Sequence, residues 1–251
     1  MKVALLAAGV GKRLDRSGNA PPKTLLRFAG ESLLKRHLDI LVQFGLVDVT
    51  LVVGHRAEEI ERELAAIGAT DLVRTLFNPD YRTSSLLSLW TLREVFAAGE
   101  PVLYMDADVL YDRRLLARLL ESPHDDRLLI DCGAPPSEEC LKVCIRDGRV
   151  VEFHKRIQAT SYEYWAEWIG FARFGPISAR QLVGAIRRYV ESGRTGVIYE
   201  EPMRDVILAS ERFGFVDSAA LPWIEIDFPE DLERAQSEIL PRLVDAPASR
   251  R

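Results

Sequence analysis

The sequence predicts a Rossmann-like α/β fold, in which a mostly parallel mixed sheet carries helices on both faces. Apolar runs bounded by Gly, Pro and Asp alternate with stretches of helical period, which is the pattern of successive βαβ units. Glycine-bearing and acidic segments follow the ends of apolar runs, where open α/β sheets bind ligands. The chain has 251 residues and a hydrophobic content of 47%, so it is long enough to bury a full core as one domain.

The first half of the chain repeats a strand-and-helix unit. The helix expected after the first strand places Leu34, Leu38 and Leu41 on one face, and Gly45 follows its end. We expect strands at residues 2–8, 47–53, 72–77 and 102–105, and helices at residues 31–44, 57–67 and 85–98.

The pattern changes after Leu120. A turn at Asp147-Gly148 predicts a hairpin, and Pro229 followed by two acidic residues predicts the first turn of the last helix. We expect strands at residues 127–132, 141–146, 150–154, 168–174, 213–217 and 223–226, and helices at residues 178–192 and 201–210. The second half therefore extends the sheet of the first half within a single domain, residues 1–251.

The composition limits the classes of partner. A net charge of -5 argues against a nucleic-acid surface, because binding to the phosphate backbone needs an excess of Lys and Arg. The sequence contains no run of about 18 apolar residues, so we expect no membrane span. The apolar stretch at residues 3–8 is too short for a signal peptide. Three cysteines give no disulfide framework and fit a reducing compartment, so we expect a cytoplasmic protein with a small-molecule partner.

A glycine-bearing loop, residues 9–13, follows the first strand. A dinucleotide-binding fingerprint would need a third glycine where Leu14 stands, and the Gly-Lys-Ser/Thr ending of a Walker A loop is absent. The remaining interpretation is a loop whose backbone N–H groups approach phosphates, with Lys12, Arg13 and Lys23 as flanking cations. Such a loop suits a triphosphate; the alternative is an ordinary turn with solvated basic residues.

Two acidic residues, Asp106 and Asp108, follow the strand predicted at residues 102–105. Carboxylates that point into a phosphate site would repel the substrate unless a cation lies between them, which implies Mg²⁺. The alternative for this pair is the capping of a helix.

A third segment, Trp223-Ile-Glu-Ile-Asp227, forms the end of a late strand. Strand alternation places Trp223, Glu225 and Asp227 on one face of that strand. Two acidic side chains would be unfavourable against an apolar core, so this face is either a ligand site or exposed to solvent. The alternative for Asp227 is the cap of the helix that opens at Pro229.

Aromatic and acidic residues gather in the second half of the chain. Aromatic faces and carboxylates together favour an ammonium or quaternary ammonium group. The alternative is that these rings belong to the core. The aromatic residues are Tyr162, Tyr164, Trp165, Trp168, Tyr199 and Trp223, and the acids among them are Glu163, Glu167, Glu200, Glu201 and Glu225.

The segment Leu6-Ala-Ala-Gly-x-Gly-x-Arg-Leu14, followed by Pro22-Lys23-x-Leu25, resembles the signature of the sugar-1-phosphate nucleotidyltransferase superfamily, which has a GT-A-like fold. Further patches are similar to the branch of CTP:phosphocholine, 2-aminoethylphosphonate and inositol-phosphate cytidylyltransferases. These patches are Asn78-x-x-Tyr81-x-x-x-Ser85-x-x-Ser88-Leu89, Asp106-Ala-Asp108, Trp165-Ala-Glu167-Trp168-Ile-Gly170 and Trp223-x-Glu-Ile-Asp227. Relatives in this branch often have Asn where the chain has Ser85, which has fewer hydrogen-bonding groups.

The resemblance implies transfer of CMP from CTP to a small phosphorylated or phosphonate alcohol or amine, with release of pyrophosphate. Phosphocholine and 2-aminoethylphosphonate are the favoured acceptors. Alternatives are a sugar-1-phosphate or inositol-phosphate nucleotidyltransferase that uses CTP, UTP or dTTP, and a non-catalytic nucleotide-binding regulatory subunit. Residues 1–120 would bind the nucleotide, residues 121–244 would bind the acceptor, and residues 245–251 would form a tail. The sequence leaves association as a homodimer open.

The resemblance also implies roles for individual residues. Arg13, Lys23, Asp108 and Asp227 would be catalytic, and Asp108 and Asp227 would hold Mg²⁺. The nucleotide would be bound by Leu6, Ala7, Ala8, Gly9, Gly11, Lys12, Arg13, Lys23, Asn78, Ser85 and Asp106. The acceptor would be bound by Trp165, Glu167, Trp168, Tyr199, Glu200, Trp223 and Glu225.

Overall fold

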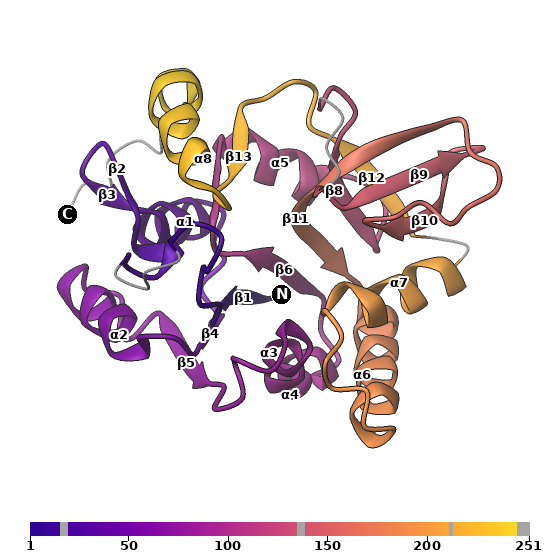
Figure 1. Cartoon of the computed structure of the whole chain (residues 1–251), viewed down its shortest axis with the longest axis horizontal. Helices are drawn as coiled ribbons and strands as arrows, with labels where there is room; N and C mark the ends of the chain where they lie inside the picture. The colour runs from indigo at the N-terminus through magenta and orange to yellow at the C-terminus, as the bar shows by residue number, and fades with distance from the viewer. Residues whose placement is uncertain (16–19, 135–138, 211–212, 245–251) are drawn as a thin grey trace.

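A computed structural model describes residues 1–15, 20–134, 139–210 and 213–244 of the chain (Figure 1). The first half contains β1 (Lys2–Ala7), a 3₁₀ turn (Lys23–Leu25), β2 (Arg27–Phe28), β3 (Glu31–Ser32), α1 (Leu33–Gln43), β4 (Val49–Val53), α2 (Ala57–Ala66), β5 (Val73–Phe77), α3 (Ser85–Thr91), α4 (Arg93–Ala97), β6 (Val102–Asp106), β7 (Val109–Tyr111) and α5 (Arg113–Glu121). The second half contains β8 (Arg127–Asp131), β9 (Lys142–Arg146), β10 (Arg149–His154), β11 (Tyr164–Phe174), α6 (Pro176–Glu191), α7 (Glu200–Ala209), β12 (Gly214–Asp217), β13 (Trp223–Glu225) and α8 (Pro229–Arg234). The predicted tail, residues 245–251, lies outside the described residues.

The central sheet is mixed. Strands β6, β1, β4 and β5 are parallel neighbours in that order, and they form the part that the βαβ pattern predicted. The long strand β11 pairs antiparallel with β6, β8 and β9, and it thereby joins the parallel part to the sheet extension. One sheet therefore runs through both halves of the chain.

Helices cover both faces of this sheet. One face packs on α3, α4, α6 and α7, and the other packs on α1, α2 and α5, as the two principal core clusters show (Figure 1). Alternation along β1 divides its side chains between the two cores, with Ala4 in the first and Val3 and Leu5 in the second. A strand buried on both faces is typical of a parallel sheet covered by helices.

The predicted elements are present, with shifts at their ends. The helix predicted from residue 31 begins at Leu33, because the Ser32 side chain accepts a hydrogen bond from the Lys35 backbone N–H at 3.2 Å and caps it. The helix predicted at residues 85–98 is interrupted at Leu92 and forms α3 and α4. Strand β11 begins at Tyr164, four residues earlier than predicted.

Two expectations from composition can be compared with the described residues. None of the helices in the described part of the chain combines the length and hydrophobicity that crossing a bilayer requires. Cys132, Cys140 and Cys144 form no disulfide, and Cys140 and Cys144 are buried. Burial raises the pKa of the Cys144 thiol to about 11, so this thiol stays neutral and packs as an apolar group.

Candidate active site

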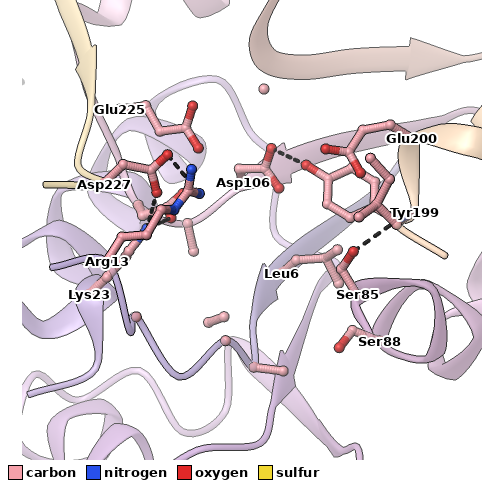
Figure 2. A pocket seen from close by; sticks show the side chains of 18 of the residues that line it. Leu6, Arg13, Lys23, Ser85, Ser88, Asp106, Tyr199, Glu200, Glu225 and Asp227 are labelled. Carbon is pink, nitrogen blue, oxygen red and sulfur yellow. Dashed lines mark hydrogen bonds and ion pairs between the residues drawn. The ribbon is translucent and has the colours of Figure 1, made fainter. Parts of the chain in front are cut away.

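A cavity of about 400 Å³ opens at the carboxyl ends of β1 and β6. Figure 2 shows its two sides, with Arg13, Lys23, Glu225 and Asp227 on one, Tyr199 and Glu200 on the other, and Asp106 between them. The cavity is lined by Leu6, Ala7, Ala8, Gly9, Gly11, Lys12, Arg13, Lys23, Thr24, Tyr81, Ser85, Ser88, Asp106, Ala107, Asp108, Glu139, Leu141, Lys155, Trp168, Gly170, Ile198, Tyr199, Glu200, Glu225 and Asp227.

The glycine-bearing loop lies along the cavity as the sequence predicted. All residues from Leu6 to Arg13 that were assigned to the nucleotide line the cavity, and so does Lys23. Gly11 has a φ of +69°, and a Cβ atom there would lie 3.5 Å from the Lys23 side chain. A backbone in the left-handed region beside a lysine explains the preference for glycine at this position.

Three carboxylates meet at one side of the cavity. Asp108, Glu225 and Asp227 each offer an oxygen atom, and these atoms all lie within 4.8 Å of one another. The antiparallel pairing of β13 with β7 brings them together, and the Ile226 N–H donates to the Asp108 carbonyl oxygen at 3.1 Å. The two acidic motifs, more than 100 residues apart in sequence, therefore form one cluster.

Two cations contact this acidic cluster. Lys23 Nζ lies 2.9 Å from Asp108 Oδ2 and 2.6 Å from Asp227 Oδ1, and Arg13 Nη2 lies 2.8 Å from Asp227 Oδ2. Burial alone would lower the pKa of Lys23, but the two carboxylates raise it above its ordinary value, so the ammonium stays charged. The alternative of Asp227 as a helix cap is not what the structure shows. Its carboxylate binds these cations, and Asp231 accepts the backbone N–H groups of Asp227 and Phe228.

The donor set of the acidic cluster suits a divalent cation. Part of Glu225 reaches solvent, yet desolvation within the cavity, followed by repulsion from Asp108 and Asp227, raises the pKa of Glu225 well above its usual range. Repulsion from the two aspartates thus outweighs the attraction of Lys23 at the Glu225 carboxyl group. Carboxylate oxygens are hard ligands of the kind that Mg²⁺ and Ca²⁺ prefer, so the chemistry of these residues fits a hard divalent ion.

Asp106 has a different environment from the acidic cluster. The Tyr104 and Tyr199 hydroxyls each donate to one of its carboxylate oxygens at 2.7 Å. Gly170, with a φ of +86°, gives this carboxylate room, because a Cβ atom there would lie 2.8 Å from Asp106 Oδ2. Burial, and then the charge of Asp108, raises the pKa of Asp106 well above its ordinary value. Asp106 is therefore a fixed carboxyl group in the cavity wall and not a helix cap.

Two residues predicted to bind the nucleotide, Ser85 and Asn78, divide between the cavity and the wall behind it. Ser85 lines the cavity, and its Oγ accepts the Tyr199 backbone N–H at 3.1 Å. Asn78 does not line the cavity. Its amide donates to Ser88 Oγ at 3.0 Å and its carbonyl oxygen accepts the Asp80 N–H at 2.9 Å. The structure thus places Asn78 behind Ser88, which does line the cavity.

Four of the seven residues predicted to bind the acceptor line the cavity: Trp168, Tyr199, Glu200 and Glu225. Trp168 is 5% exposed, stacks on Tyr104 with ring centroids 6.1 Å apart, and donates its indole N–H to the Phe171 carbonyl oxygen at 2.9 Å. Burial raises the pKa of Glu200 to about 6, and its Oε2 accepts no hydrogen bond from any residue that the structure describes.

The other three, Trp165, Glu167 and Trp223, lie outside the cavity. The Trp223 indole N–H donates to Asp131 Oδ2 at 2.8 Å, and Glu167 lies opposite Asp131 in the pairing of β11 with β8. The Trp165 ring faces Lys142 Nζ, 5.8 Å from the ring centroid. Burial, then the charge of Asp131, raises the pKa of Glu167 to about 7. These residues form a separate cluster because the acceptor residues on β11 alternate between the two faces of the sheet.

The cavity also contains residues that the sequence did not single out as ligands. Lys155 enters from the segment after β10, and Glu139 accepts a hydrogen bond from Arg13 at 3.3 Å. Tyr81 lines the cavity and was part of the resemblance pattern. The sequence around Lys155 has no local motif. Its position at the cavity follows only from the pairing of β10 in the sheet.

Comparisons with known proteins identify the family and the relatives of this chain. Residues 3–149 match the family model described as the MobA-like NTP transferase domain. The bifunctional IPC transferase and DIPP synthase of Rubrobacter xylanophilus is 30% identical over 94% of this chain and 51% of its own length. The CMP-5'-(3-aminopropyl)phosphonate synthase of Streptomyces rubellomurinus is 26% identical over 96% of this chain and 39% of its own length. The chain thus spans about half of the first relative and less of the second.

Among solved structures, the inositol-1-phosphate CTP transferase from T. maritima superposes with a TM-score of 0.75. The two chains are 22% identical, and the match covers 96% of this chain and 93% of the other. This likeness confirms the predicted fold class.

Proposed function

The chain belongs to the MobA-like NTP transferase family, and from that premise we propose that it is a CTP-dependent cytidylyltransferase. It transfers CMP to a small phosphorylated or phosphonate alcohol or amine and releases pyrophosphate. The names of two relatives refer to CMP or to CTP, which supports cytidine as the base. In this proposal the nucleotide lies on the loop after β1, where Leu6 to Gly9 and Gly11 to Arg13 line the cavity.

The observation that carries this proposal is the pairing of two cations with two acids at the phosphate end of the cavity. Lys23 bridges Asp108 and Asp227, and Arg13 contacts Asp227. A triphosphate and its counter-ion need cations for the phosphates and carboxylates for the ion within the same few ångströms. The four side chains supply both kinds of group.

The reaction that suits these residues is an in-line displacement at the α-phosphorus of CTP. An acceptor phosphate or phosphonate oxygen forms the new P–O bond, while the bond from the α-phosphorus to the bridging oxygen breaks and its electron pair leaves with pyrophosphate. The acceptor oxygen is already ionised, so the reaction needs no general base. Lys23 and Arg13 stabilise the charge that grows on the departing pyrophosphate.

Asp108 and Asp227, with Glu225 beside them, are the residues that would hold Mg²⁺. When bound, Mg²⁺ neutralises phosphate charge and orients the triphosphate. The backbone N–H groups of the loop at residues 9–13 hold phosphate oxygens without adding side-chain bulk. Lys155 brings a further cation into the cavity, and it is suited to the phosphate or phosphonate of the acceptor.

Trp168, Tyr199 and Glu200 supply the aromatic and acidic part of the acceptor pocket. A carboxylate oxygen without a hydrogen bond from the described residues, as in Glu200, suits an ammonium group or a sugar hydroxyl. Inositol-1-phosphate is the second candidate acceptor. The superposition on an inositol-1-phosphate CTP transferase over 96% of the chain favours it.

The proposal is tested by a pyrophosphate-release assay with Mg²⁺ that crosses four nucleotides with four acceptors. The nucleotides are CTP, UTP, dTTP and GTP, and the acceptors are phosphocholine, 2-aminoethylphosphonate, inositol-1-phosphate and glucose-1-phosphate. We expect acceptor-dependent release with CTP and a CMP-linked product in the mass spectrum. Release confined to UTP or dTTP with glucose-1-phosphate would replace the proposal with a sugar nucleotidyltransferase, and no acceptor-dependent release with any pair would reject it.

A further inference from the structure

One buried carboxylate joins two elements that border the acceptor end of the cavity. Glu152 on β10 is 1% exposed, and its two oxygens accept from Arg204 on α7. The distances are 2.6 Å from Arg204 Nε to Oε1 and 3.1 Å from Nη2 to Oε2. This two-point contact fixes the distance and also the relative orientation of β10 and α7.

The same carboxylate binds the backbone on both sides of Lys155. Glu152 Oε1 accepts the Phe153 N–H at 3.0 Å, and Oε2 accepts the Gln158 N–H at 3.1 Å. Burial would raise the pKa of Glu152, but Arg204 and the two backbone donors lower it below its ordinary value. The carboxylate therefore stays ionised, and it fixes both ends of the segment that carries Lys155.

A second contact joins this segment to the first turn of α7. His154 Nε2 lies 3.2 Å from Glu201 Oε1, and the Arg156 backbone N–H donates to His154 Nδ1 at 3.0 Å. His154 Nδ1 also lies 2.8 Å from the Arg156 carbonyl oxygen. The Lys155 carbonyl oxygen accepts from Lys142 Nζ at 3.1 Å. The backbone on each side of Lys155 is thus held by hydrogen bonds.

Both joined elements reach the cavity, with Lys155 on the segment after β10 and Tyr199 and Glu200 at the start of α7. We propose that Glu152 and Arg204 are a positioning pair that keeps Lys155 and Glu200 at the spacing the acceptor needs, an inference that rests on the proposed function. Neither member of the pair lines the cavity, so the pair acts through Lys155, Tyr199 and Glu200.

A merely structural ion pair would give a different result. Loss of one partner of a buried pair destabilises the whole fold, and it would impair CTP and acceptor alike. A positioning pair affects the acceptor selectively, because the loop at residues 9–13 and Lys23 make no contact with Glu152 or Arg204 among the interactions described above. The planar guanidinium group of Arg204 also matters for positioning, because lysine keeps the charge of arginine but not its two-point contact.

The test compares Arg204→Lys and Arg204→Met with Arg114→Met as the matched control. Arg114 also forms a two-point contact with a buried carboxylate, Asp112, at 2.8 Å for each bond, and neither residue lines the cavity. Steady-state kinetics give kcat and KM for CTP and for the acceptor. Hydrogen exchange reports protection at residues 154–158, 199–201 and 9–13.

For Arg204→Lys we expect kcat/KM for the acceptor to fall about 10-fold, and for Arg204→Met about 100-fold, as for a small displacement of positioned groups. The KM for CTP should stay within about twofold of the wild-type value. Arg114→Met should change the kcat/KM for CTP and for the acceptor by no more than about twofold. Exchange should rise at residues 154–158 and 199–201 and not at residues 9–13. If Arg204→Met does not fold, the kinetics and the hydrogen exchange of Arg204→Lys test the inference.

Equal losses for CTP and acceptor, or equal effects of Arg204→Lys and Arg114→Met, would overturn the inference. Unchanged exchange at residues 154–158 in Arg204→Lys would overturn it as well. A wild-type protein without acceptor-dependent pyrophosphate release would reject the proposed function. In that case the exchange measurement still decides whether the pair holds the Lys155 segment in place.

Discussion

The two ends of the cavity are built in different ways. The end that we assign to the phosphates consists of the loop at residues 9–13, Lys23 and the acids at strand ends, and Lys23 and Arg13 form ion pairs with two of these acids. The acceptor end combines a strand, a helix start and an irregular segment, and its Glu200 has a pKa raised by burial to about 6. A short local motif can therefore predict the phosphate end from the sequence. The acceptor end forms only when elements that are distant in sequence pack together.

This difference is also one of electrostatics. At the phosphate end Lys23 lies 2.9 Å from Asp108 and 2.6 Å from Asp227, and Arg13 lies 2.8 Å from Asp227, so removal of the charge of any of these four side chains leaves a partner unbalanced. At the acceptor end, Trp168 and Tyr199 contribute packing and hydrogen bonds. Conservative substitutions should be tolerated better there than at the phosphate end. Substitutions at the two ends should differ in size and in which substrate they affect.

Asp227→Asn should have the largest effect. It removes a carboxylate charge from the acidic cluster and breaks the balance with Lys23 and Arg13, so we expect kcat to fall about 1000-fold or more. Asp48→Asn is the control, because Asp48 lies outside the cavity and its Oδ2 accepts a hydrogen bond from Lys2, which an amide oxygen can also accept. Turnover by Asp227→Asn within tenfold of wild type would contradict the assignment of the phosphate end.

Lys23→Met should lower kcat about 100-fold, because it removes one cation from the developing pyrophosphate. The same change should strengthen binding of Mn²⁺ without nucleotide by about tenfold, since the ammonium no longer balances Asp108 and Asp227. Electron paramagnetic resonance of free Mn²⁺ measures this directly. Weaker Mn²⁺ binding by Lys23→Met than by wild type would show that the acidic cluster is not the ion site.

Substitution of the two tryptophans tests the boundary of the acceptor end. Trp168→Phe should raise the acceptor KM about 3- to 10-fold and leave the CTP KM unchanged, because Trp168 lines the cavity. Trp223→Phe should leave both values within about twofold, since its indole contacts Asp131 outside the cavity. Steady-state kinetics with both substrates varied measure the effects. If Trp223→Phe raised the acceptor KM more than Trp168→Phe, the acceptor would instead bind at the separate cluster of Trp165, Glu167 and Trp223.

Glu167→Gln should have the smallest effect, on stability alone. Its pKa is raised in the folded protein from 4.5 to about 7, so the ionised form destabilises the fold above pH 7, and this penalty vanishes below about pH 4.5. The variant should therefore be more stable than wild type at pH 8, on the order of 1 kcal/mol after solvent screening, and equal to it at pH 4.5. Thermal unfolding at both pH values measures this, and a gain only at low pH would contradict the account.

The sequence signals of the end that we assign to the phosphates are local. The loop at residues 9–13 follows a strand and carries its own glycines, and Asp108 follows another strand within two residues of its end. The joining of Asp108 to Asp227 depends on β7, a three-residue strand that the periodicity did not indicate and that pairs with β13. Pairings of such short strands over long sequence distances leave no local pattern.

Only some of the residues predicted to bind the acceptor line the cavity, for a physical reason. Trp165, Glu167 and Trp168 are neighbours in sequence, but alternation along β11 sends the first two to one face and Trp168 to the other, where the cavity lies. Lys155 follows β10 in a segment without periodicity, so its place depends on the contacts of Glu152 and His154 with α7. Composition indicated which residue types gather there, and packing selected which of them line the cavity.

The most direct test follows the α-phosphate itself. CTP labelled with ³²P at the α-position is incubated with the wild-type protein, Mg²⁺ and each acceptor in turn, and the products are separated. We expect the label to move to a CMP-linked acceptor with one pyrophosphate released per transfer, and Asp108→Asn to abolish this transfer. Label that stays in CTP with every acceptor, or label that appears only as free CMP, would contradict this expectation.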